Sequence, residues 1–338
     1  MRKLIASVFF AFVVAVAAFL LWPSTDTGLV LYTGLDYGPA VAAAFTKETG
    51  IKVSVVRLST GSLLARIVAQ GDHPDWDIGW FDGATAAAAL DQAHLLAHGL
   101  PAPAGLTPLG QGLLSPDGAY IPTGITLAGV FVSDPAKLAV APTGWNDLLS
   151  SVYKNLLGMN DPSISGPTYP MLAGMLDNAG GWPQGQKYVL GLKANGLHMF
   201  DKNDATLAAL QSQAISLAIV QSSAALFYAA HHPGMRITVP NPAYVLPNVM
   251  VEAAGLNSRR QKEAARFMAF AMRPDIQRLR QTQGEADGEY WPITQNAPAP
   301  LPGVPALAGI NTITLNPVVW GGLESSINSW FAQMMSGA

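Results

Sequence analysis

Residues 58–83, LSTGSLLARIVAQGDHPDWDIGWFDG, contain the pattern that decides the fold. They begin at the end of one apolar strand, pass through a hydroxyl-rich turn into a short helix, and finish in a second buried strand. Leu63, Leu64 and Ile67 fall on one face of that helix, which is the spacing of an amphipathic element. The stretch therefore predicts a strand, a crossover helix and a second strand parallel to the first.

The same rhythm continues on both sides of this stretch. Residues 28–33 form an apolar run typical of a buried strand, and Pro39 then fits the first turn of a helix that ends at Gly50. Residues 51–58 alternate between apolar and polar side chains, and an alanine-rich helix follows residue 83. The order is βαβαβα, which predicts an α/β fold with a parallel sheet and right-handed crossovers.

Polar residues gather where these strands end, and open parallel sheets bind ligands beyond the carboxyl ends of their strands. We therefore expect the ligand site to include residues from all three turns: Thr33, Asp36, Tyr37, Thr60, Gly61, Ser62 and Asp82. A Ser/Thr/Gly turn at a helix start can hold an anion with backbone N–H groups and hydroxyls. The alternative interpretation is an ordinary helix cap, with each aspartate a capping or loop carboxylate.

The hydroxyl-rich turn recurs twice in the second half of the chain. One copy follows an apolar piece at 156–159 and the other follows the apolar strand 215–220; they supply Ser163, Ser165, Gly166, Thr168, Ser222 and Ser223. Segments 120–133 and 237–246 are strand-like but contain proline, so we interpret them as crossings between two lobes. Tyr244, on the second crossing, is a candidate for the cleft wall. Turns on two facing lobes would form a clamp around a ligand.

Three further elements are expected after the second crossing. Residues 247–253 predict a strand, and residues 258–278 predict a helix that Pro274 splits. Residues 324–335 predict a terminal amphipathic helix.

The N-terminus and the composition indicate an exported protein. Arg2 and Lys3 precede an unbroken apolar run at residues 4–22, which predicts either a cleaved secretory signal or an uncleaved membrane anchor. Only 12% of the 338 residues are charged, the net charge is −3 and no basic run occurs, so nucleic acid is not an expected partner. The chain has no cysteine, which excludes disulfides, thiol catalysis and cysteine metal sites.

Five segments resemble the periplasmic solute-binding proteins of ABC importers, in their ferric-iron, phosphonate and organophosphate branch. They are AFTKETGIKVSVV (44–56), STGSLLARIVAQGDHPDWDIGW (59–80), NDPSISGPTYPMLAGML (160–176), AISLAIVQSSAALFY (214–228) and KEAARFMAFAMRPDIQ (262–277). The resemblance implies a type II periplasmic binding protein, with two Rossmann-like lobes joined by crossing hinge strands. The expected boundaries are a signal or anchor at 1–25, lobe 1 at 26–124 plus 240–295, and lobe 2 at 125–239 plus 296–338.

The resemblance also implies partners and a ligand. A monomeric periplasmic protein of this kind captures a small solute in the interlobe cleft and delivers it to an ABC permease and its ATPase, with no catalysis and no cofactor. Iron-binding members carry two consecutive tyrosines after the strand that corresponds to 215–220, whereas this chain has Gln221, Ser222 and Ser223. Serine hydroxyls are poor substitutes for phenolate ligands of ferric iron. We therefore expect a phosphonate, an organophosphate or a similar oxyanion.

Several alternatives remain at this point. Asp36 and Asp82 would meet an amino group if the ligand carries one, as in an aminoalkylphosphonate. A ferric-iron carrier and a ligand-sensing module for a receptor would share the same fold. A hydrolase is disfavoured, because the chain has no GxSxG, P-loop or GxGxxG motif and no evident base beside Ser222. His94 and His98 have metal-ligand spacing but no HExxH context, so we interpret them as solvated.

Overall fold

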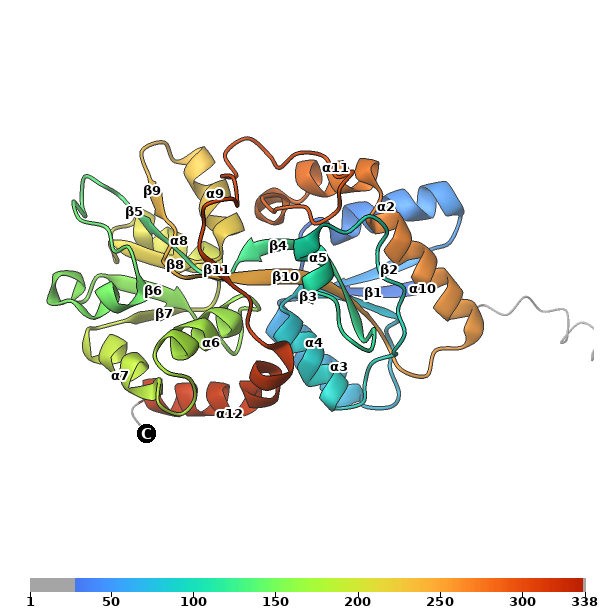
Figure 1. Ribbon diagram of the computed structural model, residues 1–338, viewed down its shortest axis with the longest axis horizontal. Helices are drawn as coiled ribbons and strands as arrows, with labels where there is room; N and C mark the ends of the chain where they lie inside the picture. Colours follow the sequence, from blue (N-terminus) through green and yellow to red (C-terminus); the bar gives the residue numbers. More distant parts are fainter. Residues whose placement is uncertain (1–27, 337–338) are drawn as a thin grey trace, which may run out of the picture.

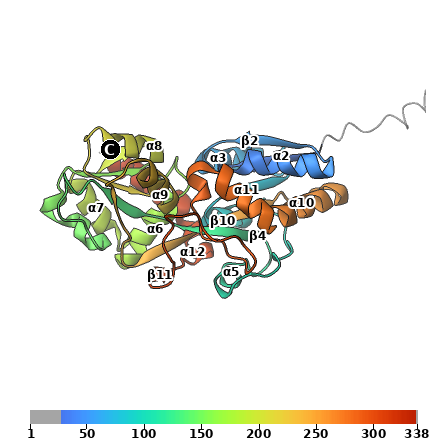
Figure 2. The ribbon, with the colours of Figure 1, turned by 90° about the horizontal axis from the view of Figure 1, so that it is seen from above.

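The computed structural model describes residues 28–336, and the predicted signal or anchor at 4–22 lies outside these described residues. Two lobes lie side by side, each built on one β-sheet with helices on its faces (Figure 1). Seen from above, the polypeptide passes between the lobes near the middle of the molecule (Figure 2). Within residues 28–336, no helix is both long and apolar enough to cross a membrane.

The first sheet has the strand order β11-β10-β3-β1-β2, with β4 paired to β10. Its parallel centre consists of β1 (Leu29–Thr33), β2 (Val53–Arg57) and β3 (Ile78–Asp82). Thr33 is in register with both Arg57 and Trp80, so the three strands end at the same edge. The predicted α/β arrangement is confirmed, and its polar turns meet at that edge.

Local sequence explains the boundaries of the helices around this sheet. Gly50 ends the first helix at a left-handed φ of 73°, a conformation that glycine adopts without strain. Pro274 begins a new helix, so the long apolar pattern after residue 257 divides in two, as predicted. The helices are α2 (Gly38–Thr49), α3 (Thr60–Gln70), α4 (Ala84–Gln92), α5 (Pro108–Gly112), α10 (Ser258–Ala271) and α11 (Pro274–Gln283).

The second sheet has the order β7-β6-β8-β5-β9 and is built from one continuous part of the chain. Its strands are β5 (Val130–Ser133), β6 (Leu157–Asn160), β7 (His198–Phe200), β8 (Leu217–Val220) and β9 (Arg236–Thr238). Its helices are α6 (Thr168–Asn178), α7 (Gln186–Ala194), α8 (Asn203–Gln211) and α9 (Ser222–His231). Helices α6, α8 and α9 each start shortly after a strand ends, so their N-termini face the other lobe's polar edge.

Two long strands carry the chain between the sheets. β4 (Tyr120–Leu127) pairs in the first sheet, and β5 follows it directly into the second. The segments 237–246 and 247–253 were expected to be a crossing and a separate strand, but β10 (Ala243–Glu252) runs through both without a break. Pro247 sits inside this strand opposite Ile125, beside a register shift between Asn248 and Val249 that relaxes the pairing. Pro247 therefore does not interrupt the strand, although proline in the sequence indicated a break there.

The C-terminal helix α12 (Pro317–Ser336) packs on both lobes and begins earlier than the sequence pattern indicates. Near its start, Gly321 lies so close to α4 that a Cβ there would be 2.5 Å from the Thr85 carbonyl oxygen. Near its end, Trp330 packs edge-on against Trp182 of the second lobe, with ring centroids 5.2 Å apart. α12 is thus a third connection between the lobes, beside the short strand β11 (Thr312–Ile313) that pairs with β10.

The core of the first lobe encloses an arginine. Arg280 is 0% exposed and its guanidinium carbon lies 4.7 Å from the ring centroid of Tyr37, 5.1 Å from that of Trp80 and 4.6 Å from that of Tyr290. Its Nη2 also donates a hydrogen bond of 3.3 Å to the Tyr37 hydroxyl. Three aromatic faces therefore replace the carboxylate that usually accompanies a buried cation.

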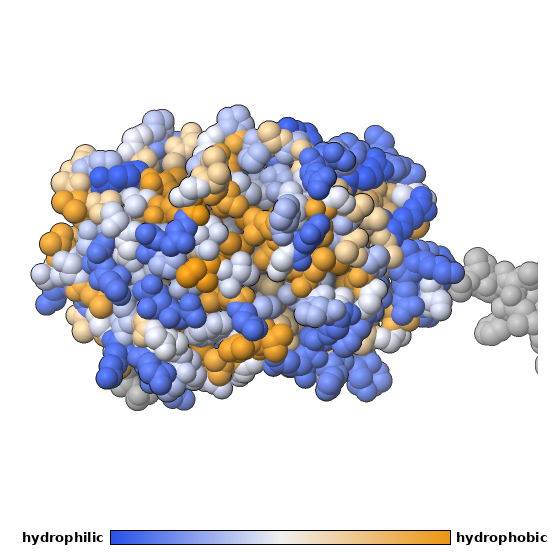
Figure 3. All heavy atoms as spheres, in the orientation of Figure 1, coloured by the Kyte–Doolittle hydropathy of each residue, from blue (hydrophilic) through white to orange (hydrophobic). Residues whose placement is uncertain are grey.

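On the face seen in Figure 3, apolar residues gather toward the middle of the molecule and hydrophilic residues dominate the end that carries α2 and α10. At the start of α12, Val318 and Val319 are 58% and 54% exposed. Hydrophilic residues are thus distributed unevenly over this face of the molecule.

Candidate functional site

A cleft of about 710 Å³ lies between the lobes, at the edge where β1, β2 and β3 end. The first lobe contributes the turns after these strands, including Asp36, Thr60 and Asp82, together with the segment 285–287. The second lobe contributes Ser165 and Gly166 and the first turns of α8 and α9. The position agrees with the expectation that an open α/β sheet binds its ligand beyond the carboxyl ends of its strands.

A buried carboxyl group lies at the floor of this cleft. Asp82 is 5% exposed, and its Oδ1 accepts hydrogen bonds from Asn248 Nδ2 at 2.6 Å and from Gln221 Nε2 at 3.3 Å. Its Oδ2 accepts no hydrogen bond from any residue in 28–336. Burial raises the pKa of Asp82 to about 6, although the two amide donors oppose the rise.

A second acidic side chain shares this environment. Asp287 Oδ2 accepts a hydrogen bond of 2.7 Å from the backbone N–H of Asp36. Burial, and then the nearby charge of Asp82, raise the pKa of Asp287 well above its ordinary value. Asp36 itself is paired with Arg57 at the cleft rim. The first-lobe wall therefore holds two carboxyl groups that form no salt bridge in the described chain, although the charge of Arg57 partly opposes the rise in the Asp287 pKa.

The second-lobe wall has the opposite character. Helices α6, α8 and α9 begin at residues that line the cleft or adjoin it, and none of the three has a side-chain N-cap. The first N–H groups of a helix lack intrahelical acceptors and carry partial positive charge. Lys202 also lines this wall, with its Nζ 3.4 Å from Asp204. This wall can therefore receive an oxyanion through backbone donors.

The turn at residues 59–62 behaves differently from this wall. Ser59 is the N-cap of α3, and its Oγ accepts from the backbone N–H of Ser62 at 3.4 Å. Ser62 is exposed and does not line the cleft. The capping interpretation thus describes Ser59 and Ser62, and both Ser59 and Thr60 line the cleft.

The lobes touch directly at this turn. A Cβ placed on Gly61 would lie 2.5 Å from the Ser163 carbonyl oxygen, and one on Gly166 would lie 2.3 Å from Thr60 Oγ1. Only glycine allows backbones to approach so closely. On the other side of this contact is a second cavity of about 630 Å³, which Gly61 and Ser163 line.

The structure brings some of the predicted residues together and leaves others elsewhere. Five line the cleft: Asp36, Thr60, Asp82, Ser165 and Gly166. Gly61 and Ser163 lie at the interlobe contact. Seven do not line the cleft: Thr33, Tyr37, Ser62, Thr168, Ser222, Ser223 and Tyr244.

Each buried member of that last group has a structural explanation. Thr33 Oγ1 accepts from the backbone N–H of Leu35 at 3.0 Å, and Ser222 Oγ accepts from that of Leu127 at 2.9 Å. Ser223 and Thr168 are 0% and 1% exposed, so their hydroxyls do not reach a solute. Tyr37 packs on Arg280, and Tyr244 belongs to the core of the second lobe. The expected clamp of hydroxyls is therefore much smaller than predicted.

Several charged residues of the cleft were not predicted from the sequence. Arg57, Lys202, Glu285 and Asp287 all line the cleft. Asp287 lies in a 3₁₀ turn, Glu285–Gly288, more than 200 residues after Asp82. No local motif marks such a residue, because tertiary contacts, among them the pairing of β10 with β3 and the packing of Arg280 on Tyr37, bring this part of the chain back to the first lobe.

The paired histidines are not part of this cleft. Within the described residues, the one group of three side chains that could jointly hold a metal ion is Asp91, His98 and Asp117. His98 Nε2 lies 2.6 Å from Asp91 Oδ1, and this contact raises the pKa of His98. His94 is not a member of this group, and both histidines are exposed.

Comparisons with known proteins agree with this architecture. The iron-bound HitA of Pseudomonas aeruginosa is 20% identical, with a TM-score of 0.75 over 90% of this chain and 99% of that chain. The AfuA protein of Actinobacillus pleuropneumoniae, with fructose-6-phosphate bound, is 17% identical, with a TM-score of 0.78 over 93% and 100%. A periplasmic thiamin binding protein is 18% identical, with a TM-score of 0.74 over 91% and 96%.

These likenesses establish the type II periplasmic binding fold, while the bound molecules differ from one protein to the next. A comparison with curated proteins found no match. Residues 40–309 match the family described as bacterial extracellular solute-binding protein, whose members are carriers that deliver small ligands to ABC permeases from the periplasmic side. The match spans most of the 338 residues, and the chain therefore belongs to the bacterial extracellular solute-binding proteins of ABC importers.

Proposed function

We propose that the protein delivers a small zwitterionic solute to its importer, one that carries both an ammonium group and an oxyanion. An aminoalkylphosphonate is the simplest member of this class. The observation that supports the proposal is the opposite character of the two cleft walls. One wall presents unpaired carboxyl groups, and the other presents uncapped helix N-termini.

The cationic end of such a ligand fits the first lobe. Asp82 Oδ2 has no donor in the described chain, and Asp287 lies near enough for its pKa to respond to the Asp82 charge. Asp82 is buried and Asp287 is half-buried, and their carboxyl groups repel each other when both are ionised. An ammonium group between them would remove the repulsion and supply up to three hydrogen-bond donors.

The anionic end fits the second lobe. The first turns of α8 and α9 line the cleft with Asn203 and Ala224, and Lys202 stands beside them. Backbone N–H groups at helix starts bind phosphate and phosphonate oxygens without requiring a basic side chain. Because the two ends of the ligand would contact different lobes, binding would favour the closed arrangement over the open one.

Ferric iron is the competing ligand. Gln221, Ser222 and Ser223 occupy the position of the tyrosine pair, and Gln221 Nε2 is a donor directed at Asp82 and Thr126. A donor at this point repels a metal cation, and the Ser222 hydroxyl is already committed to Leu127. These contacts support a solute that is not a metal ion.

Isothermal titration calorimetry with 2-aminoethylphosphonate, ethylphosphonate, ethylamine and ferric citrate would test the proposal. We expect 2-aminoethylphosphonate to bind much more tightly than ethylphosphonate or ethylamine, because each of these lacks one of the two charged ends. Asp82→Asn should weaken its binding roughly 100-fold, the scale of losing one partner of a buried charge pair.

The matched control is Asp72→Asn, which alters an aspartate that does not line the cleft. It should leave the affinity unchanged. Tight ferric binding that survives Asp82→Asn, or equal affinity for 2-aminoethylphosphonate and ethylphosphonate, would contradict the proposed ligand class while leaving the role as a carrier intact.

A further inference from the structure

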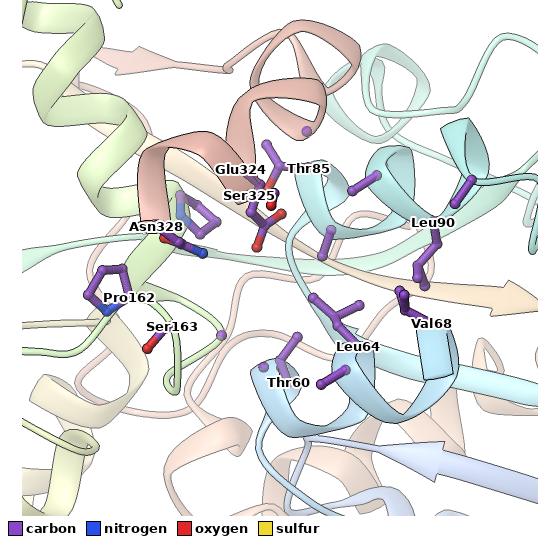
Figure 4. A pocket seen from close by; sticks show the side chains of 18 of the residues that line it. Thr60, Leu64, Val68, Thr85, Leu90, Pro162, Ser163, Glu324, Ser325 and Asn328 are labelled. Carbon is purple, nitrogen blue, oxygen red and sulfur yellow. The ribbon is translucent and has the colours of Figure 1, made fainter. Parts of the chain in front are cut away.

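The second cavity, beyond the contact between Gly61 and Ser163, is open to solvent and adjoins the cleft at Thr60, Ser165 and Gly166, but most of its lining is its own. Its walls come from α3, α4 and α12 and from the loop before α6. Figure 4 shows Leu64 and Val68 on one side of it and Glu324 and Asn328 on the other. The cavity is comparable in volume to the ligand cleft, about 630 Å³ against about 710 Å³.

Three polar oxygens at this cavity are buried without a hydrogen-bond partner among the described residues. They are Thr85 Oγ1, Glu324 Oε2 and Asn328 Oδ1. Thr85 is only 5% exposed. A buried polar atom without a partner is costly, and native structures contain few of them. Three such oxygens, each on a residue that lines the same cavity, therefore point to a missing donor.

Helix geometry places the residues that carry these oxygens along one line of contact. Gly321, Glu324 and Asn328 are separated by three and four residues on α12, so they form one stripe on the helix surface. Gly321 is the point where α12 meets Thr85. The stripe therefore continues from the Thr85 contact directly along the cavity wall.

Within residues 28–336, the cavity is lined by one acidic residue and by no basic residue. Glu324 is the single ionisable residue among those that line it, and no lysine, arginine or histidine does so. Burial raises the pKa of Glu324 to about 7, and the Tyr169 hydroxyl nearby donates to the Trp320 carbonyl oxygen instead of to Glu324. The rest of the lining is largely apolar, with Leu64, Val68 and Leu90 among its members.

We propose that this cavity is a second ligand site, for a small primary amine with a short apolar chain, held by Glu324, Asn328 and Thr85. An ammonium group has three donors and no acceptor, which complements three acceptor oxygens. The hydrocarbon part would lie against Leu64, Val68 and Leu90. The site and the solute cleft share Thr60, Ser165 and Gly166, but the proposed acceptors line this cavity and not the cleft, and Asp82 and Asp287 line the cleft and not this cavity.

The test uses calorimetry with n-butylammonium as the probe, and with n-butanol and butyrate as its neutral and anionic counterparts. We expect saturable one-to-one binding of n-butylammonium only. Glu324→Gln should weaken it roughly tenfold or more, since the amide keeps the size of the side chain and removes its charge. Ala65→Phe, on the exposed side of α3, should abolish binding by filling the cavity without altering an acceptor.

Two further variants separate this site from the cleft. Ser326→Ala, at an exposed α12 position that does not line the cavity, should bind the probe as the unaltered protein does. Asp82→Asn should also keep this binding while it weakens binding in the cleft. The proposal is overturned if the probe does not bind, if n-butanol binds equally well, or if binding survives Glu324→Gln and Ala65→Phe in proteins of unchanged melting temperature.

Discussion

At the scale of single residues, the cleft depends on the carboxyl group of Asp82, whose ionisation is disfavoured by burial. Asp82 ends β3 and receives two amide donors on one oxygen, while the other oxygen has no donor among the described residues. The sequence predicted this residue because it ends a strand of the parallel sheet. It did not predict Asp287, whose position depends on tertiary packing.

The pKa of Asp82 predicts how stability depends on pH. Its folded value of about 6 lies above its ordinary value of 3.8, so protonated Asp82 is favoured in the folded state and stability is lost as pH rises from about 4 to 6. The shift corresponds to about 3 kcal/mol. Asp82→Asn should therefore stabilise the ligand-free protein at pH 7.5 and have little effect at pH 4, as measured by chemical denaturation at both values.

The control for that measurement is Asp72→Asn at the same two values of pH. If Asp82→Asn gives the same change in the free energy of unfolding at pH 4 and pH 7.5, then Asp82 is not held in the protonated form by its surroundings.

Arg280 gives a second prediction at this scale. Its planar guanidinium faces three rings, and the ammonium of lysine cannot stack in the same way. Arg280→Lys should lower the free energy of unfolding by about 2 kcal/mol, the scale of desolvated cation–π contacts. Arg278→Lys, on the exposed face of α11, should change it little. Equal effects of the two substitutions would mean that the rings do not stabilise the cation.

At the scale of elements, sequence patterns were reliable where they were local. The strands β1 to β3, the helix that ends at Gly50 and the break at Pro274 were all predicted, because caps and periodicity act over a few residues. The pattern failed at β10, where pairing on both sides keeps Pro247 within one strand. It also failed for the start of α12, whose first turns are held by packing against α4.

Adjacent glycines in α12 test that packing. A Cβ on Gly321 would meet backbone atoms of α4, so Gly321→Ala should destabilise the protein by about 1–3 kcal/mol. A Cβ on the exposed Gly322 would meet only the end of the Gln92 side chain, and Gly322→Ala should stabilise it by up to about 1 kcal/mol through helix propensity. Thermal unfolding of the two variants measures the difference, and effects of the same sign would show that α12 does not press on α4.

At the scale of the whole molecule, the two-lobed architecture followed from the sequence, but the composition of the cleft did not. Hydroxyl-rich turns were expected to surround the ligand, yet Ser222, Ser223 and Thr168 are buried. A turn can be placed at the correct edge of a sheet from sequence periodicity, whereas the direction of each side chain depends on packing from the other lobe. Carboxyl groups and helix starts, rather than hydroxyls, therefore give the cleft its character.

The interlobe contact predicts how closure can be blocked. Gly166→Val would place side-chain atoms against Thr60, so it should favour the open arrangement and lower solute affinity roughly tenfold, equivalent to about 1.4 kcal/mol. Small-angle X-ray scattering with saturating solute should show a larger radius of gyration than for the unaltered protein. Gly112→Ala, at a site where a Cβ meets nothing within 4 Å, is the control. Unchanged affinity and size would mean that the contact is not needed for closure.

The two sheets also differ in how the chain supplies their strands. All five strands of the second sheet come from one uninterrupted span, residues 130–238, whereas the first sheet needs β10 from beyond that span. A protein that emerges from a membrane channel from its N-terminus onward would present the complete second sheet before β10 appears. We therefore expect the second lobe to fold first during export. Until β10 emerges, the partial sheet formed by β1, β2 and β3 would have an exposed apolar edge.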